Sequence, residues 1–425
     1  VIKVKIPGCD DARHNEGMKI AMIVRRLNIK GGAQRQVLEL ARELQARGHT
    51  ITIYTFAYSP QDCFDDLLRD LRVVAWDKLS RLSLNNGGLS SICARFLRGS
   101  FFEENRRAKQ LAMQIDKDID LLHPHDQVSY RVAAYYKKCV RDVPSVWMMN
   151  DVPTRAYADW YGRQINSDTH VPLFKRIAHW LVDAYDIQRF VRVQNAIAVL
   201  DNFNRLNARR FLGRDATVVR SGLDINTFQY IERAPPDRAQ TTLLTTGIFM
   251  RHRRFEDAIE ATKILVDRGI NASLTIIGDQ QGDRKYYEEI RRLVEERKLA
   301  DRVLFLGKVS EEDLTAAYRR HHIFVFPNDP QTWGLAVFEA MASGMPVVVS
   351  RGAGAHEVLT DGVDALLVQP REPRAIADAV GRLADDPVLY RALSKNGRAF
   401  VEKNISWERY ADQMLEIFKK VSKIP

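Results

Sequence analysis

The chain has 425 residues, of which 45% are hydrophobic and 28% charged, and its formal net charge is +10. This length suits two domains rather than one, the composition is that of a globular protein, and the lack of any uncharged apolar run of about 18 residues argues against a membrane-spanning helix. The four cysteines form no CxxC pair, as in proteins of reducing compartments. We therefore expect a cytoplasmic protein and leave open a peripheral contact with the inner face of a membrane.

The positive charge favours an anionic partner, which could be nucleic acid, a lipid surface or a phosphorylated small substrate. The Lys and Arg residues are scattered along helical patterns and form no block with interleaved aromatic residues. Such blocks are typical of nucleic-acid interfaces. We therefore expect no nucleic acid partner.

Short apolar, β-branched runs alternate with helical patterns from Met18 onward, after a leader or extension of unknown role at residues 1–17. This alternation predicts βαβ units and parallel sheets. The run 231–240 interrupts it with two prolines and is the predicted linker. The predicted strands span residues 19–24, 50–55, 72–76, 119–123, 145–149, 196–200, 217–219, 242–247, 273–278, 302–307, 323–327, 346–350 and 365–370.

Two doubly wound domains follow, an N-terminal one at residues 18–232 and a C-terminal one at residues 233–404. A final helix is expected within residues 405–425, because apolar residues recur there at helical spacing. Ligands of open parallel sheets bind at the carboxyl ends of the strands. The expected site is therefore the cleft between the two domains.

Gly31 and Gly32 follow the first predicted strand and precede a helical pattern. Glycine lets the backbone approach a ligand, and a helix start offers free N–H groups and the positive end of its dipole. The pair suits a phosphate or a developing oxyanion. A tight strand-to-helix turn explains it equally well.

His123 and His125 lie at the end of a predicted strand, on one side of an extended segment. A catalytic base or donor, a structural hydrogen-bonding pair and a metal pair are all open. Metal is the least favoured, because no third ligand appears at matching spacing. The acidic run DKDID at residues 116–120 precedes this strand, at the end opposite to a ligand site. We therefore expect no metal ion.

Arg251, Arg253 and Arg254 follow the predicted strand 242–247. Guanidinium groups are planar donors that suit the oxygens of a diphosphate. A solvated run of charge is the alternative. The position at a carboxyl strand end favours an anion site.

The stretch QTWGLAVFEAMASG, residues 331–344, follows the predicted strand 323–327 and begins a helix near Gly334. Free N–H groups at that helix start can receive phosphate. Glu339 lies inside the helix, where its side chain leans toward the start and a carboxylate can accept both hydroxyls of a ribose. A solvated face is the alternative, but the flanking residues read as buried, and a charge among them needs a partner.

Together these residues resemble the retaining GT-B glycosyltransferases of family 4, most specifically in QTWGLAVFEAMASGMPVVVS and the later GAGAHEVLTDG. The family has two Glu separated by seven residues. Here Glu339 matches the second and Gln331 replaces the first. The resemblance implies an α/β protein with two Rossmann-like domains facing a central cleft. Its C-terminal helix would cross back to the N-terminal domain, and it would need no cofactor besides a nucleotide diphosphate sugar as donor substrate.

The resemblance also implies roles for single residues on the donor side. Glu339 would bind the ribose and Gln331 the donor sugar. Arg253 matches the family's Lys on the phosphates, whereas Ile248 stands at the usual Arg, so Arg251 or Arg254 would substitute. The remaining implied donor contacts are Gly31, Gly32, Trp333, Gly334 and Leu335 near the diphosphate, and Lys308 and Val309 near the base.

On the acceptor side, His125 matches the family's His near the transferred sugar, next to His123, and Asn150 stands where a further His is usual. Because an amide at position 331 cannot be the carboxylate nucleophile of a double displacement, the resemblance implies a front-face route with His125, Arg253 and Gln331 as catalytic residues.

The expected activity is transfer of a sugar from a UDP- or GDP-sugar to a saccharide or lipid-linked acceptor. A GT-B epimerase or phosphorylase, and a catalytically silent binder, are the alternatives. The amphipathic segment 171–193 is expected to be a core helix of the N-terminal domain; its alternative is contact with an anionic membrane that supplies the acceptor.

Overall fold

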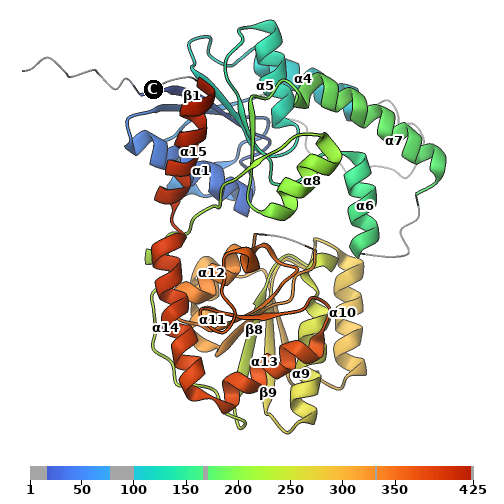
Figure 1. The fold of residues 1–425 in the computed structure, drawn as a ribbon, viewed down its shortest axis with the longest axis vertical. Coiled ribbons are helices and arrows are strands. Elements are labelled where there is room, and N and C mark those ends of the chain that lie inside the picture. The colour runs from blue at the N-terminus through green and yellow to red at the C-terminus, as the bar shows by residue number, and fades with distance from the viewer. Residues whose placement is uncertain (1–16, 77–99, 166–170, 331–332, 423–425) are drawn as a thin grey trace, which may run out of the picture.

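A computed structural model describes residues 17–76, 100–165, 171–330 and 333–422. Figure 1 shows two lobes, one above the other, each built around a parallel sheet with helices on its faces. Every predicted strand is present, with bounds that differ by two residues at most. No helix in the described part of the chain has the length and apolar character needed to cross a bilayer.

The described residues of the first lobe form seven parallel strands. Their order is β3-β2-β1-β4 and β5-β6-β7, and isolated parallel bridges from Leu122 to Ser145 and from His125 to Met148 connect the two sets. The strands are β1 (Lys19–Val24), β2 (Thr50–Thr55), β3 (Arg72–Ala75), β4 (Leu121–Pro124), β5 (Val146–Met148), β6 (Ala196–Val199) and β7 (Thr217–Val218). The helices are α1 (Gly32–Ala46), α2 (Asp65–Leu68), α4 (Ser100–Ala112), α5 (Ser129–Cys139), α6 (Arg155–Ile165), α7 (Leu173–Asp186) and α8 (Asn202–Leu212).

The second lobe repeats this winding, with the parallel order β10-β9-β8-β11-β12-β13. Its strands are β8 (Thr241–Thr246), β9 (Ala272–Ile277), β10 (Val303–Gly307), β11 (Ile323–Phe326), β12 (Val347–Ser350) and β13 (Leu366–Val368). Its helices are α9 (Phe255–Asp267), α10 (Arg284–Glu296), α11 (Glu311–Arg320), α12 (Leu335–Ala342), α13 (Pro373–Asp385) and α14 (Pro387–Asn404). The predicted linker contains no helix or strand before β8.

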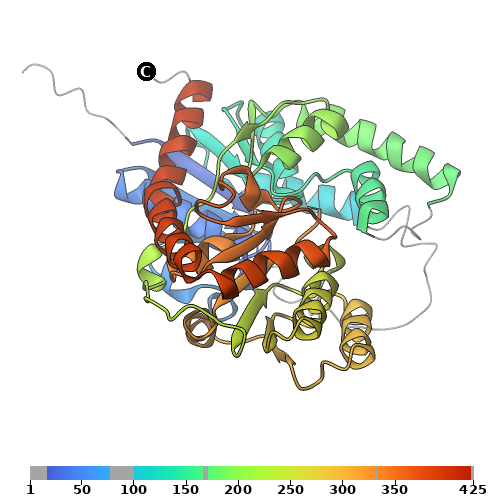
Figure 2. The ribbon, with the colours of Figure 1, turned by 60° about the horizontal axis from the view of Figure 1, so that its bottom comes forward.

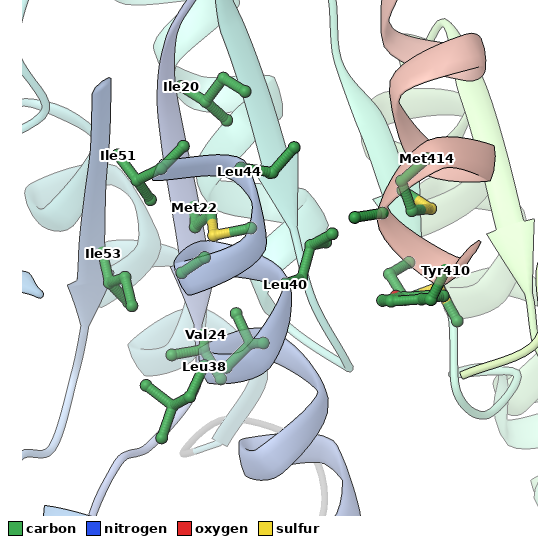
Figure 3. Packing of buried hydrophobic residues seen from close by; sticks show 14 of the residues in the cluster. Ile20, Met22, Val24, Leu38, Leu40, Leu44, Ile51, Ile53, Tyr410 and Met414 are labelled. Carbon is green, nitrogen blue, oxygen red and sulfur yellow. The ribbon is translucent and has the colours of Figure 1, made fainter. Parts of the chain in front are cut away.

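The last helix, α15 (Trp407–Ser422), returns to the first lobe, as the resemblance implied. Figures 1 and 2 show α14 along the second lobe and α15 continuing along the first. Tyr410 and Met414 belong to the same buried cluster as Ile20 and Met22 of β1 and Leu40 of α1, a packing visible in Figure 3. Burial of these apolar side chains ties the end of the chain to its first strand.

The expectation for the segment 171–193 is wrong in one respect. It does form a helix, α7, but the apolar side chains of that helix face solvent instead of the core. The cause is that polar side chains on the other side of α7 form hydrogen bonds and an ion pair with α5 and α6.

Candidate active site

A cavity of about 340 Å³ lies between the two lobes, at the carboxyl ends of both sheets. Parallel strands of a doubly wound sheet all end at this edge, which is why loops from distant parts of the chain meet there. The first lobe contributes Gly32, Ala33, Gln36, Asn150, Asp151, Leu200, Asp201, Asn204 and Ser221. The second contributes Thr246, Gly247, Arg253, Phe326, Trp333, Gly334, Leu335 and Ala336.

Two helix starts point into this cavity. Gly32 is the first residue of α1, and Gly334 precedes the first residue of α12. Gly334 has a φ of 81°, and a Cβ there would lie 2.8 Å from Cε1 of Phe326. Both the backbone conformation and the space therefore require glycine. Free N–H groups and the positive dipole ends of α1 and α12 make the cavity suitable for an anion.

Arg253 is the arginine of the predicted cluster that lines the cavity. It is half-buried, and its Nε has no hydrogen-bonding partner among the described residues. Burial lowers the pKa of Arg253 to about 10, an effect that Tyr161 opposes. Gly247 makes room for this guanidinium, since a Cβ at residue 247 would lie 2.8 Å from Nε of Arg253. The group stays cationic at neutral pH and presents unused donors to an anion.

Arg251 and Arg254 are bonded to carboxylates outside the cavity. Arg251 pairs with Glu289 at 2.8 Å, and Arg254 pairs with Asp257 at 2.8 Å and with Glu256 at 2.7 Å. Neither lines the cavity. The structure thus separates Arg253 from its neighbours, a distinction that the sequence left open.

Glu339 lies behind the start of α12. It accepts a hydrogen bond of 2.8 Å from the hydroxyl of Tyr318, and it is half-buried between buried neighbours, as its sequence context predicted. Burial raises the pKa of Glu339, whereas Tyr318 and the nearby Arg35 of α1 lower it. Trp333, on the cavity side, is buried, and its ring packs at a tilt of 36° against Phe338 with ring centroids 5.0 Å apart.

The predicted base contacts lie on the loop after β10. Lys308 is exposed there, and Val309 is half-buried against the apolar cluster of α12 and β11. Neither residue lines the cavity. Gln331 lies outside the described residues, so its role stays a prediction.

His123 and His125 lie behind the cavity wall. Their rings are 4.2 Å apart, and His123 packs against Phe418 of α15 at 4.9 Å. Nδ1 of His123 donates to the carbonyl oxygen of Val146 at 2.6 Å. Burial lowers the pKa of His123 to about 4 and that of His125 well below its usual value, so both imidazoles are neutral at pH 7.

Asn150 does reach the cavity, where its amide donates to Oδ1 of Asp126 at 2.6 Å. Two acidic neighbours were missed in the sequence, Asp151 and Asp201, which directly follow the strand runs ending near β5 and β6. Their position after carboxyl strand ends was the signal that could have identified them. The walls of the cleft displace water from Asp151 and so raise its pKa to about 7, and the charges of Asp126 and Asp201 add to the rise. Part of the Asp151 side chain remains exposed to solvent.

Side chains also link the lobes beside the cavity. Arg35 of α1 pairs with Glu311 of α11 at 2.8 Å. Glu357 accepts from the backbone N–H of Asn202 at 3.0 Å and from Arg220 at 2.9 Å. These contacts hold the two walls of the cavity against one another. Within the described residues, no group of three or more His, Cys, Asp or Glu side chains is arranged to hold a metal ion.

Comparison with known proteins finds glycosyltransferases that are similar to this chain in sequence and in fold. The model of the glycosyl transferases group 1 matches residues 227–400, and that of glycosyltransferase family 4 matches residues 30–225. A glycogen synthase of Mycobacterium tuberculosis is 22% identical over 398 residues, which cover 91% of each chain. A D-inositol 3-phosphate glycosyltransferase of Corynebacterium glutamicum is 27% identical over 403 residues, again 91% of each.

Among solved structures, Anabaena HepE in complex with UDP and glucose has the same fold, with a TM-score of 0.69 and 17% identity over 95% of this chain and all of that one. The two family models together span most of the chain, and each matches the residues of one lobe. The chain belongs to the family 4, group 1 glycosyltransferases and has their GT-B fold.

Proposed function

We propose that this glycosyltransferase transfers a sugar from a UDP- or GDP-sugar to a saccharide or lipid-linked acceptor. In this proposal the anomeric configuration is retained and no metal ion takes part. The observation that carries it is the convergence of Arg253 and the starts of α1 and α12 on one cavity. These are the positive groups that a diphosphate leaving group needs.

The donor would lie on the wall formed by the second lobe. The diphosphate would contact Arg253 and the backbone at Gly334 and Leu335, and Glu339 would bind the ribose. Lys308 and Val309 would lie near the base. HepE holds UDP and glucose, which makes UDP the first nucleotide to test.

The acceptor would lie on the wall formed by the first lobe. Asn150 and Asp151 present an amide and a carboxylate to the cavity there, and both can bind sugar hydroxyls. His125 lies behind this wall, where it can position the loop after β4 but does not line the cavity. We therefore assign it support of the acceptor wall rather than contact with substrate.

Retention would follow a front-face route. The acceptor hydroxyl attacks the anomeric carbon on the side from which the diphosphate departs, the bond from carbon to phosphate oxygen breaks, and the departing phosphate takes the hydroxyl proton. The amide of Gln331 supports this route because an amide cannot form the glycosyl ester of a double displacement. Changing Gln331 to Glu should weaken catalysis or alter donor choice, by adding negative charge beside the phosphates.

Nucleotide release from UDP-, GDP- and ADP-sugars, with thermal shifts measured in parallel, tests the proposal. Release from a UDP- or GDP-sugar that an acceptor accelerates is the expected result. A thermal shift without release, with every acceptor offered, would instead support a silent sugar-nucleotide binder. NMR of the product's anomeric proton distinguishes retention from inversion.

A further inference from the structure

Helix α7 exposes a large apolar surface. Six of its side chains are between 53% and 70% exposed: Leu173, Phe174, Ile177, Trp180, Leu181 and Tyr185. At about 100° per residue, these positions fall on one arc of about 140°. A surface helix normally turns such an arc toward the core, so this helix presents its apolar side outward.

The opposite side of α7 is polar and is bonded to the protein. Asp183 accepts hydrogen bonds from the backbone N–H groups of Arg155 and Ala156, at 3.0 and 2.8 Å, and so caps the start of α6. His179 contacts Asp159 of α6 at 2.7 Å. These bonds fix the rotation of the helix, because turning the apolar arc inward would break them.

Asp186, deeper in the lobe, strengthens this arrangement. Asp186 pairs with Arg131 of α5 at 2.8 Å and accepts a hydrogen bond from Tyr130. Both members of the ion pair are buried, and separating a buried pair is costly. The outward apolar face is therefore built into the fold. Figures 1 and 2 show α7 at the outer margin of the first lobe.

The exposed charges of α7 itself are positive. The exposed charged side chains of α7 are Lys175 and Arg176, whereas its acidic residues, Asp183 and Asp186, are buried. Arg163, exposed near the end of α6, adds a further positive charge. A second copy of the chain docked through the same face would bring like charges together. An anionic surface complements them.

We propose that α7 docks the protein on an anionic lipid bilayer, with its apolar arc in the interface and Arg176 and Arg163 toward the headgroups. An amphipathic helix with aromatic and aliphatic side chains on one face and basic residues beside it binds such a surface in the plane of the membrane. Trp180 and Tyr185 are side chains that favour the interfacial region. This proposal concerns binding alone and does not depend on the donor, the acceptor or the stereochemistry of transfer.

Cosedimentation with vesicles, without any sugar nucleotide, tests the docking. The full chain should bind phosphatidylcholine vesicles that contain about a third phosphatidylglycerol, and bind pure phosphatidylcholine vesicles far more weakly. The double substitution F174E/L181E should lower the partition coefficient about tenfold or more, because it places charge in the apolar arc that would lie in the bilayer interface. The matched control is V363E/V388E, which also adds two negative charges, since Val363 and Val388 are 49% and 73% exposed and lie on the other lobe.

Trp180 gives a second measurement on the same samples. The difference in emission between the wild type and W180F should shift to the blue when anionic vesicles are added. Far-UV circular dichroism should show the same folded content in every variant, since all substituted side chains are exposed.

Several results would overturn the proposal. Equal vesicle binding by F174E/L181E and the wild type would place the contact elsewhere. A concentration-dependent dimer that F174E/L181E abolishes would make a second copy the occupant. If Trp180 is already shielded from acrylamide without lipid, and vesicles change nothing, another segment of this chain covers the face.

Discussion

Tyr318 on α11 donates a hydrogen bond of 2.8 Å to Oε2 of Glu339 on α12. Tyr318 is fully buried. Burial raises the pKa of Glu339, and the hydrogen bond from the Tyr318 hydroxyl lowers it. The hydroxyl therefore orients the carboxylate and favours its charged form. Both effects matter if Glu339 receives the two ribose hydroxyls of the donor.

Substituting Tyr318 by Phe should weaken UDP binding about tenfold, because a hydrogen bond to a charged group contributes roughly 1.5–3 kcal/mol. Isothermal titration calorimetry with UDP measures the effect. The control is Y390F, since Tyr390 is also buried in the second lobe and donates to the backbone oxygen of His322 at 2.9 Å. Equal affinities in the two variants would remove Glu339 from the ribose site.

Arg253 and Arg251 should differ in their effect on turnover, although both belong to one short basic run. Arg253→Ala should lower kcat about 10²- to 10³-fold, as expected for loss of a group that stabilises a departing anion. Arg251→Ala should mainly lower the melting temperature, because its guanidinium is paired with Glu289. Steady-state kinetics and thermal unfolding of the two variants make the comparison. A reversed order would assign the phosphate contact to Arg251.

Asp151 should give the reaction a pH dependence. Its pKa is raised to about 7, so its carboxylate is protonated below that pH and charged above it. If the charged form binds the acceptor hydroxyl, kcat/KM for the acceptor should rise about tenfold per pH unit below pH 7 and then level. Asp151→Asn should give a low and flat profile while UDP affinity is unchanged. An identical rising limb in the variant would assign the titration to another group.

The strands and the place of the site were predictable from the sequence because each depends on local pattern. Every strand is a short apolar run, and the carboxyl-end rule brought Gly32, Asn150 and Gly334 to one cavity. Asp151 follows the same rule and could have been found with it.

What the sequence could not predict depends on partners distant in the chain. Arg251 lies outside the cavity because its guanidinium pairs with Glu289 on the next helix, α10. His123 is enclosed because α15 returns from the end of the chain to place Phe418 against it. The helical period of α7 was evident, but its orientation depends on bonds to α5 and α6, which no local pattern encodes.

His123 should make the first lobe sensitive to acid. In the unfolded chain an imidazole takes a proton near pH 6.5, whereas burial lowers the pKa of His123 to about 4 in the folded protein. Between these values the unfolded state binds more protons, so stability falls as the pH drops from 6.5 to 4. The full loss is about 3 kcal/mol for this residue.

His123→Asn tests this origin of acid sensitivity. The amide of Asn can still donate toward the carbonyl oxygen of Val146 but does not titrate. The variant should be less stable than the wild type at pH 7.5, because packing against Phe418 is lost. Its stability should nevertheless fall less steeply between pH 6.5 and 4. Urea unfolding at several pH values measures both quantities, and parallel curves for the two proteins would mean that groups other than His123 take up the proton.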